Sequence, residues 1–147
     1  MGKDLNSMGE ACAARALSNC PIPWVKHEAA NAGNPCMNQL INVAGMGGYG
    51  RYWRLVELLS GTSTHTIPSP SEQGYKRYSL GLGFADESEF EEYIALLIDL
   101  DLVAVDSNER RYIPLVDDTA LAVGKSRYNG SKGGRAAARN RREGIGG

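Results

Sequence analysis

The order of the elements predicted from the sequence indicates a mainly α fold: a winged helix-turn-helix with a small β-hairpin wing and a flexible basic C-terminal tail. Segments with helical periodicity are followed by two short β-type runs, the element order of that motif. Strands and helices do not alternate, which argues against a parallel α/β sheet. We expect an N-terminal extension with a weak helix over residues 1–23, a winged-helix domain over 24–124 and a disordered basic tail over 125–147.

The weak helix of the N-terminal extension precedes a segment with two prolines, CPIPW. Ser7 and Glu10, three residues apart, form a capping box at its start. The alanine-rich turns that follow have a thin apolar face. This helix is therefore marginal by itself or depends on a partner surface.

Two helices separated by glycines are predicted over residues 34–59. Asn34 is a good N-cap, and Pro35 suits the first helical position. Gly45 ends the first helix, and the second runs from about Gly48 to Leu59. Both carry apolar residues at helical spacing, namely Met37, Leu40, Ile41 and Ala44, then Tyr52, Leu55, Val56 and Leu59.

The strongest helical signal begins at Ser88, which forms a capping box with Glu91. A polar loop with a short strand at 64–67 and a short helix within 71–83 precede it. The runs LVAV and RYIPL, separated by DSNER, then predict a β-hairpin, and a short helix is expected over 118–123. The apolar stripe of the strongest helix consists of Phe90, Tyr93, Ile94, Leu97 and Ile98.

The stretch GMGGYG, residues 45–50, matches the G-x-G-x-x-G fingerprint of dinucleotide-binding proteins. That fingerprint needs a strand before it and a second strand that ends in an acidic residue about 20 positions later. The preceding run has helical spacing, and no apolar strand leads to Glu72. We interpret the glycines as a helix end, a tight turn and, at Gly50, a close approach of two helices.

Catalytic, metal and cofactor motifs all lack a supporting context, so we expect a protein that is not an enzyme and uses no cofactor. VGKS at 123–126 resembles the end of a P-loop, but Thr119 stands where the loop needs glycine. No Ser or Cys stands in a recognisable nucleophile context. A zinc site would need the widely spaced Cys12, Cys20, His27 and Cys36, which lack the close pairs of structural zinc sites.

The cysteines and the hydropathy predict a cytoplasmic protein without membrane contact. The three cysteines include no C-x-x-C pair, which is typical of a reducing compartment. No apolar run approaches the roughly 20 residues that cross a membrane, and the N-terminus does not read as a secretory signal. The oligomeric state stays open.

The charge is divided between an acidic body and a basic tail. Residues 125–147 contain seven basic residues and one acid, a charge of +6; the whole chain carries −1, so residues 1–124 carry −7. Such a tail can bind DNA phosphates in a salt-sensitive manner, or it is an inert solubilising end. The hairpin arginines can likewise contact phosphates or be ordinary hairpin charges. The candidate DNA contacts are Arg110, Arg111, Lys125, Arg127, Lys132, Arg135, Arg139, Arg141 and Arg142.

The helix that would read the major groove in a winged helix is acidic. Residues 86–101 contain no Lys or Arg, so their insertion between phosphates is electrostatically unfavourable. This favours a second hypothesis: a small phage-encoded, anti-CRISPR-like inhibitor that binds a basic surface of a host nucleoprotein complex. A third, a dimeric repressor, needs a base-reading helix that the sequence lacks. The candidate partner-binding residues are Asp86, Glu87, Glu89, Glu91 and Glu92.

The run from Trp24 to Leu59 resembles the N-terminal domain of phage and prophage replication-initiation-like proteins, a DnaD-associated winged-helix family. The likeness continues more loosely to Ala138 and implies a DNA-binding protein linked to replication initiation or its control. Where the family has a pair of aspartates, this chain has Glu28 and Asn34, and Cys36 stands where the family usually has a basic residue. The matching residues are Trp24, His27, Glu28, Asn34, Gly45, Gly48, Tyr49, Gly50, Tyr52, Trp53, Leu55, Glu57 and Leu59. We expect His27 and Glu28 to pin or cap the first helix of this run rather than to bind a ligand.

Overall fold

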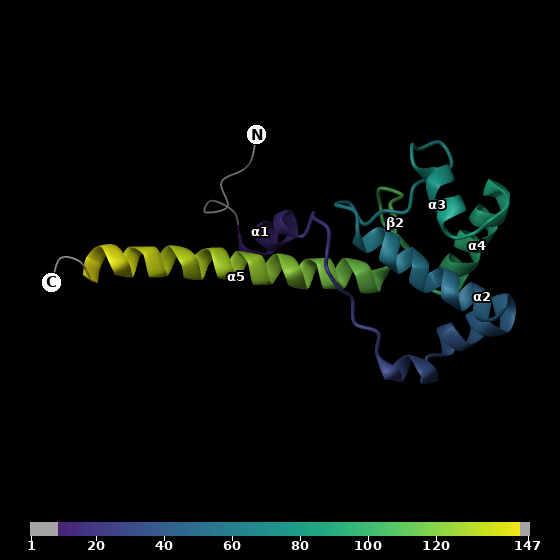
Figure 1. The fold of residues 1–147 in the computed structure, drawn as a ribbon, viewed down its shortest axis with the longest axis horizontal. Helices are drawn as coiled ribbons and strands as arrows, with labels where there is room; N and C mark the ends of the chain where they lie inside the picture. The colour runs from purple at the N-terminus through teal and green to yellow at the C-terminus, as the bar shows by residue number, and fades with distance from the viewer. Residues whose placement is uncertain (1–8, 145–147) are drawn as a thin grey trace.

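A computed structural model describes residues 9–144, apart from the side chains of 135, 136 and 142–144. The fold is mainly helical, with one two-stranded antiparallel sheet in the described part of the chain. The body lies at one end, and a long helix projects from it (Figure 1). The elements in chain order are α1 (Glu10–Leu17), the 3-10 helix η1 (Ala29–Gly33), α2 (Pro35–Ser60), α3 (Tyr75–Gly81), α4 (Glu87–Asp99), β1 (Ala104–Val105), β2 (Arg111–Tyr112) and α5 (Pro114–Gly144).

Helix α2 contains the predicted break at Gly45, but the predicted tight turn is wrong, because the glycines that follow are helical. Asn34 caps its start, because its side-chain oxygen accepts the backbone N–H of Cys36 at 2.9 Å. Gly45 has φ 71° and ψ −174°, a conformation that only glycine adopts readily, so the helix kinks there and continues to Ser60. The prediction for Gly50 is wrong: a Cβ at Gly50 meets open space, whereas Gly48 is buried.

Helix α4 begins one residue earlier than its sequence suggests. The cap is Asp86, whose carboxylate accepts the backbone N–H of Glu89 at 2.9 Å and the hydroxyl of Ser88 at 2.6 Å. The predicted capping box of Ser88 and Glu91 is therefore wrong. An aspartate at this position is an equally good cap, and its charge is favoured at a helix N-terminus. It leaves the side chain of Glu91 to other partners.

The predicted hairpin is confirmed. Strands β1 and β2 pair antiparallel, with Ala104 opposite Tyr112 and Val105 opposite Arg111. The predicted strand at 64–67 is reduced to a single bridge, in which Ile67 pairs with Arg111.

The core lies between α2, α4, the hairpin and the first turns of α5. It contains the predicted apolar stripe of α4, with Ile98 at its edge, and that of α2 except for Ile41. Tyr93 of α4 donates its hydroxyl to the Gly48 carbonyl of α2 at 2.6 Å. Burial raises the pKa of Tyr52 to about 12 and that of Tyr93 above its ordinary value, so both hydroxyls stay protonated at neutral pH. The largest side chains fully buried in this core include Leu40, Leu55, Leu59, Phe90, Ile94, Leu97, Ile113 and Val116.

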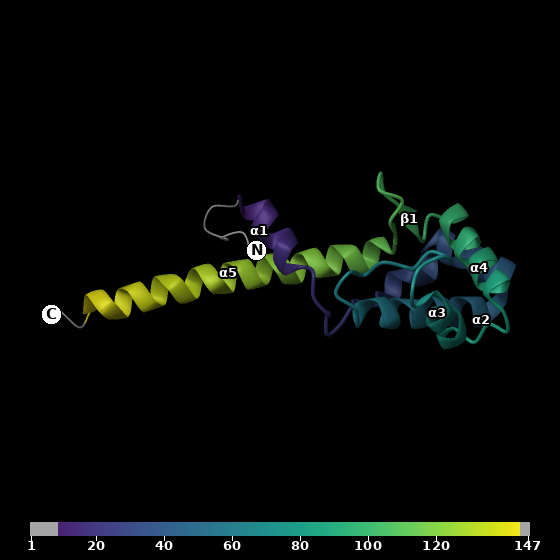
Figure 2. The same cartoon turned by 90° about the horizontal axis from the view of Figure 1, so that it is seen from above.

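Helix α5 replaces both the predicted short helix over 118–123 and most of the predicted disordered tail. It runs as one helix from Pro114 to Gly144 and extends away from the body (Figure 2). Val116 and Ala120 in its first turns are buried in the core, and this packing offsets the free-energy cost of nucleating the helix. Beyond the core, the alanines and arginines favour propagation of the helix, whereas Gly130, Gly133 and Gly134 oppose it. Residues 145–147 lie outside the described part.

The weak N-terminal helix is α1, and its partner surface is α5. Ala13 and Ala14 are buried in this contact, which also includes an ion pair of 3.3 Å between Arg15 and Asp117. The helices approach closely because position 124 is glycine: a Cβ there would overlap the Ala14 carbonyl oxygen and lie 2.9 Å from the Ser18 nitrogen. Ser7 of the predicted capping box lies outside the described residues.

Candidate nucleic-acid interface

Arg111 is an internal residue of the body. Its side chain is 11% exposed and lies 2.6 Å from a carboxylate oxygen of Glu91 on α4, and it also donates to the Pro68 carbonyl. Glu91 in turn accepts the hydroxyl of Tyr75 at 2.5 Å. Arg111, predicted as a phosphate contact, and Glu91, predicted as part of an acidic partner-binding face, are therefore each other's partner in the body.

Arg110 is also committed to the body. Its guanidinium donates to the Thr66 hydroxyl at 2.8 Å and the Thr64 carbonyl at 3.0 Å, and it lies 3.2 Å from Asp117. It also packs over the ring of Tyr112. These bonds hold the polar loop against the hairpin and α5, and they already engage the guanidinium that was predicted to contact DNA.

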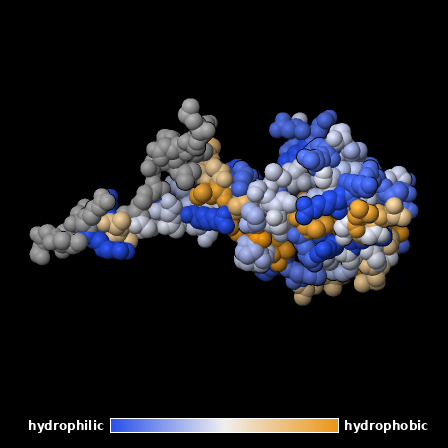
Figure 3. Space-filling model, turned by 45° about the horizontal axis from the view of Figure 1, so that its top comes forward, coloured by the Kyte–Doolittle hydropathy of each residue, from blue (hydrophilic) through white to orange (hydrophobic). Residues whose placement is uncertain are grey.

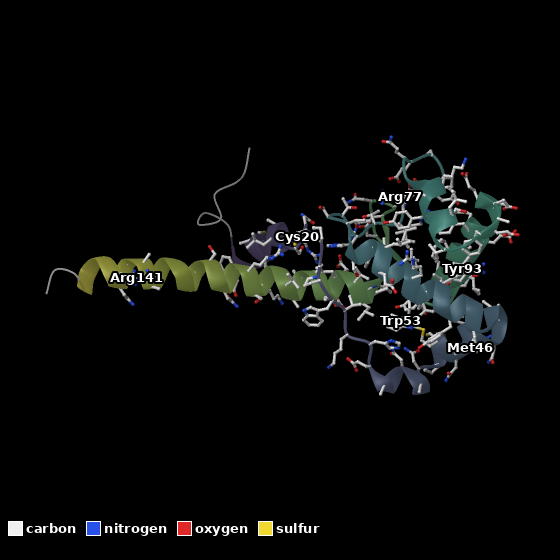
Figure 4. The ribbon with its side chains drawn as sticks, in the orientation of Figure 1. Cys20, Met46, Trp53, Arg77, Tyr93 and Arg141 are labelled. Atoms are coloured by element: carbon white, nitrogen blue, oxygen red, sulfur yellow. The ribbon has the colours of Figure 1, made fainter. Side chains whose placement is uncertain are left out.

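The basic residues of α5, in contrast, reach solvent. Lys125, Lys132 and Arg139 are exposed and follow at intervals of seven residues, which places them along one face of the helix. Arg127 and Arg141 are exposed on other sides of it, and Arg127 contacts the Cys20 sulfur at the base of the helix. Arg141 lies near the free end, far from the body (Figure 4). Arg135 and Arg142 belong to the helix backbone, but their side chains lie outside the description.

Small residues separate these charges around the helix. Gly130, Gly133 and Ala137 follow at spacings of three and four and share one face, between Lys132 on one side and Arg141 on the other. A Cβ at Gly130 or Gly133 would meet nothing within 4 Å. The projecting helix thus has a strip of small residues between basic side chains, and an extended polyanion could approach the helix backbone closely along this strip.

The acidic surface lies at the opposite end of the molecule. Helix α4 is in the part of the body farthest from the free end of α5 in both ribbon views (Figures 1 and 2). A hydrogen bond from Ser88 and then the backbone N–H of Glu89 lower the pKa of Asp86, so it is ionised at neutral pH. The exposed acids among the predicted partner residues are Asp86, Glu87, Glu89 and Glu92.

An apolar groove at the base of α5 was not predicted from the sequence. Trp24, on the proline-containing segment before η1, forms one wall, and Leu115, Ala122 and Val123 of α5 contribute to the rest. The groove encloses about 610 Å³, and Trp24 is 63% exposed. In the space-filling view, apolar colour gathers on the body and at the base of α5 (Figure 3). The only signal in the sequence is an aromatic residue between two prolines and a polar run.

A polar cavity of about 700 Å³ lies between α1, the loop after α2, the hairpin and α5. Two arginines in its wall, Arg15 and Arg110, share the carboxylate of Asp117 at 3.3 and 3.2 Å. His65 is buried there and lies 2.8 Å from the Cys20 carbonyl through Nε2. These groups already pair with one another through hydrogen bonds and ion pairs. The lining of the cavity therefore connects segments that are distant in sequence.

Within residues 9–144, no three His, Cys, Asp or Glu side chains come together in a way that could hold a metal ion. Cys12, Cys20 and Cys36 are free thiols. In the same described range, no helix has both the length and the apolar character needed to cross a membrane.

His27 pins the segment before η1 onto α2. Its ring stacks on Trp53, with centroids 3.7 Å apart and an interplanar angle of 23°, and its Nε2 lies 3.2 Å from the hydroxyl of Tyr49. Glu28 instead pairs with Lys26 at 3.7 Å. His27 therefore has structural contacts, but they are with aromatic residues of the second predicted helix and not with the first helix, which it was expected to pin or cap.

No family model matches this chain, and no curated protein or solved structure is significantly similar to it. The geometry above therefore carries the functional argument.

Proposed function

We propose that this protein binds DNA through the phosphate backbone, with the basic helix α5 as its contact surface. The observation that carries the proposal is the projection of α5 from an acidic body with Lys125, Lys132 and Arg139 exposed along one face. In line with the family resemblance, we place this binding in phage-type replication initiation or its control, in the cytoplasm. The three free thiols are consistent with that compartment.

We further propose that the body is a winged helix. The order α2, α3, α4, β1, β2 supports this, as does the packing of α2 and α4 around one core. In such a domain α4 would be the helix that enters the major groove. Its exposed acids make that docking unfavourable, so the DNA contact passes to α5 and the body sets its direction.

The affinity expected from such a contact depends on salt. Each phosphate neutralised by Lys or Arg releases counterions and adds about 0.9 to the slope of log K against log salt for duplex DNA. Contacts of this kind position a protein without reading sequence. Binding through α5 is therefore expected to be strong at low salt, weak at high salt and tolerant of sequence.

A titration of labelled duplex DNA by fluorescence anisotropy at several salt concentrations tests the proposal. Replacement of Lys125, Lys132 and Arg139 by Ala is expected to lower the affinity at low salt and to reduce the slope by about 2–3. The matched control removes three exposed basic residues of the body, Arg54, Lys76 and Arg77.

The control variant is expected to bind as the unchanged protein does. The proposal fails if duplex binding is undetectable at low salt, or if the body variant and the α5 variant lose affinity equally. Circular dichroism of both variants, with the helical signal compared at 222 nm, separates loss of contact from loss of α5.

The exposed acids of α4 support a second candidate, the inhibitor that binds a basic surface of a host nucleoprotein complex. Glu89 and Glu92 lie on the exposed side of α4, whereas Glu91 holds Arg111. A variant with Glu89→Lys and Glu92→Lys therefore tests this face without disturbing the core. Equal recovery of a nucleoprotein partner by this variant and by the unchanged protein would exclude the second candidate.

A further inference from the structure

Trp24 is displayed on a fixed backbone. Two residues before it, the backbone N–H of the buried Ile22 donates to the Ser60 carbonyl at 2.9 Å. Three residues after it, His27 stacks on Trp53. A large aromatic side chain that is 63% exposed between two such anchors contributes little to the core, and its backbone is held in place before any ligand binds.

The groove beside Trp24 suits a flat, neutral, hydrogen-bonding ring. Leu115, Ala122 and Val123 supply apolar surface next to the indole. The lining residues include the ion pair of Lys26 with Glu28 and also Asp118 and Arg127, so the groove has two charges of each sign and they balance. A phosphate gains little inside such a groove, whereas an aromatic base, thymine included, can stack on Trp24 and donate an N–H group to a carboxylate.

The groove opens onto the basic helix. Arg127 belongs both to the groove and to the exposed charges of α5. On the same side of the helix, Ser126 at the groove is followed by Gly130 and Gly133, which belong to the strip of small residues between Lys132 and Arg141. From Ser126 to Arg141 the helix rises about 22 Å, enough for several nucleotides of a backbone that starts at the groove.

From this continuity we propose that the Trp24 groove binds an unpaired base of single-stranded nucleic acid whose phosphates run along α5. The proposal rests on the proposed function and adds to it the class of nucleic acid. In a duplex the bases are paired and stacked on each other, so their faces are closed to an indole. The aromatic wall next to a row of cations is the combination that single-strand-binding surfaces use.

The experiment compares two fluorescein-labelled probes, a 20-nucleotide oligothymidine and a 20-base-pair duplex, by anisotropy at low salt. Trp24→Ala is expected to weaken binding of the single strand about tenfold and to leave binding of the duplex unchanged. Trp24→Phe keeps an aromatic face and is expected to retain most of the affinity. The matched control is Met46→Ala, a comparably exposed apolar residue at 65% that Figure 4 places at the far side of the body.

Two further readouts test stacking directly. Oligothymidine is expected to quench the tryptophan emission of the unchanged protein, and the quenching is expected to disappear in Trp24→Phe, where Trp53 is the remaining indole. A 20-residue abasic strand, which keeps the phosphates and lacks the bases, is expected to bind the unchanged protein as weakly as oligothymidine binds Trp24→Ala.

Equal binding of oligothymidine by Trp24→Ala and by the unchanged protein would overturn the inference, as would equal binding of the abasic strand. A peptide would then be the remaining candidate ligand for the groove. If duplex binding in that case remains dependent on salt and on Lys125, Lys132 and Arg139, the proposed function survives. If neither probe binds at low salt, both fail.

Discussion

Arg111 of β2 and Glu91 of α4 form an ion pair of 2.6 Å that ties the hairpin to the strongest helix of the body. The two residues come from opposite functional predictions, one as a DNA contact and the other as part of an acidic partner-binding face. Their pairing gives both a structural role, whereas Lys125, Lys132 and Arg139 of α5 are exposed along one face of that helix. It also separates the charges that hold the fold from the charges available to a ligand.

We expect Arg111→Ala to lower the free energy of unfolding by about 2 kcal/mol, because it removes hydrogen bonds between charged groups at a largely buried site. Urea unfolding at pH 7 measures this change. Arg54→Ala breaks an exposed pair with Glu57 and should cost less than about 0.5 kcal/mol. Similar losses for the two variants would show that the Arg111 pair is no stronger than a surface pair.

Gly124→Ala is expected to separate α1 from α5, because the added Cβ overlaps the Ala14 backbone. Overpacking of this kind typically costs about 1–3 kcal/mol. Amide hydrogen exchange of residues 10–17 should become markedly faster. Gly130→Ala is the control: its Cβ meets open space, and the higher helix propensity should stabilise α5 by about 0.5–1 kcal/mol. Unchanged exchange in Gly124→Ala would argue against the close crossing.

Gly45→Ala should destabilise the protein by about 1–3 kcal/mol, because φ 71° with ψ −174° is a region that side chains with a Cβ avoid. The steric surroundings are open, so the cost comes from the backbone alone. Thermal unfolding measures it. Gly47→Ala, two residues on at an equally open position outside the positive-φ region, should be neutral or stabilising. A neutral Gly45→Ala would mean that α2 is not kinked.

Asp86→Ala should reduce stability at neutral pH by a margin that disappears in acid. Hydrogen bonds from Ser88 and Glu89 hold the pKa of Asp86 below its ordinary value of 3.8 in the folded protein. The ionised cap therefore stabilises the fold above that value, and the contribution is lost as the pH falls through the lowered pKa. Unfolding midpoints at pH 7, 5, 4 and 2.5 test this. A difference between variant and unchanged protein that grows toward pH 2.5 would contradict it.

Local features of the fold could be predicted from the sequence because local interactions decide them. The Asn34 cap, the break at Gly45, the apolar stripe of α4 and the hairpin all depend on residues a few positions apart. The start of α4 was misplaced because Asp86 and Ser88 are both good caps, and the choice between them depends on what Glu91 contacts elsewhere.

The candidate site was predicted only in part, for the same reason. Composition identified the basic end of the chain, and Lys125, Lys132 and Arg139 are exposed there. Composition did not reveal its helical form. The absence of apolar periodicity indicates that a segment lacks a buried face, but a helix already nucleated in the core by Val116 and Ala120 can extend without one.

The sequence by itself determined helices α1 to α4, the hairpin and the division into an acidic body and a basic end, since each follows from composition or from neighbours along the chain. Only the tertiary structure decided which charges remain free. It paired Arg111 with Glu91, bound Arg110 to Asp117 and the polar loop, docked α1 onto α5 at Gly124 and left Trp24 facing a groove. Arg110 and Asp117 are seven positions apart, and the other pairs are about 20 to 110 positions apart. Periodicity shows which face of an element is buried but not which partner covers it.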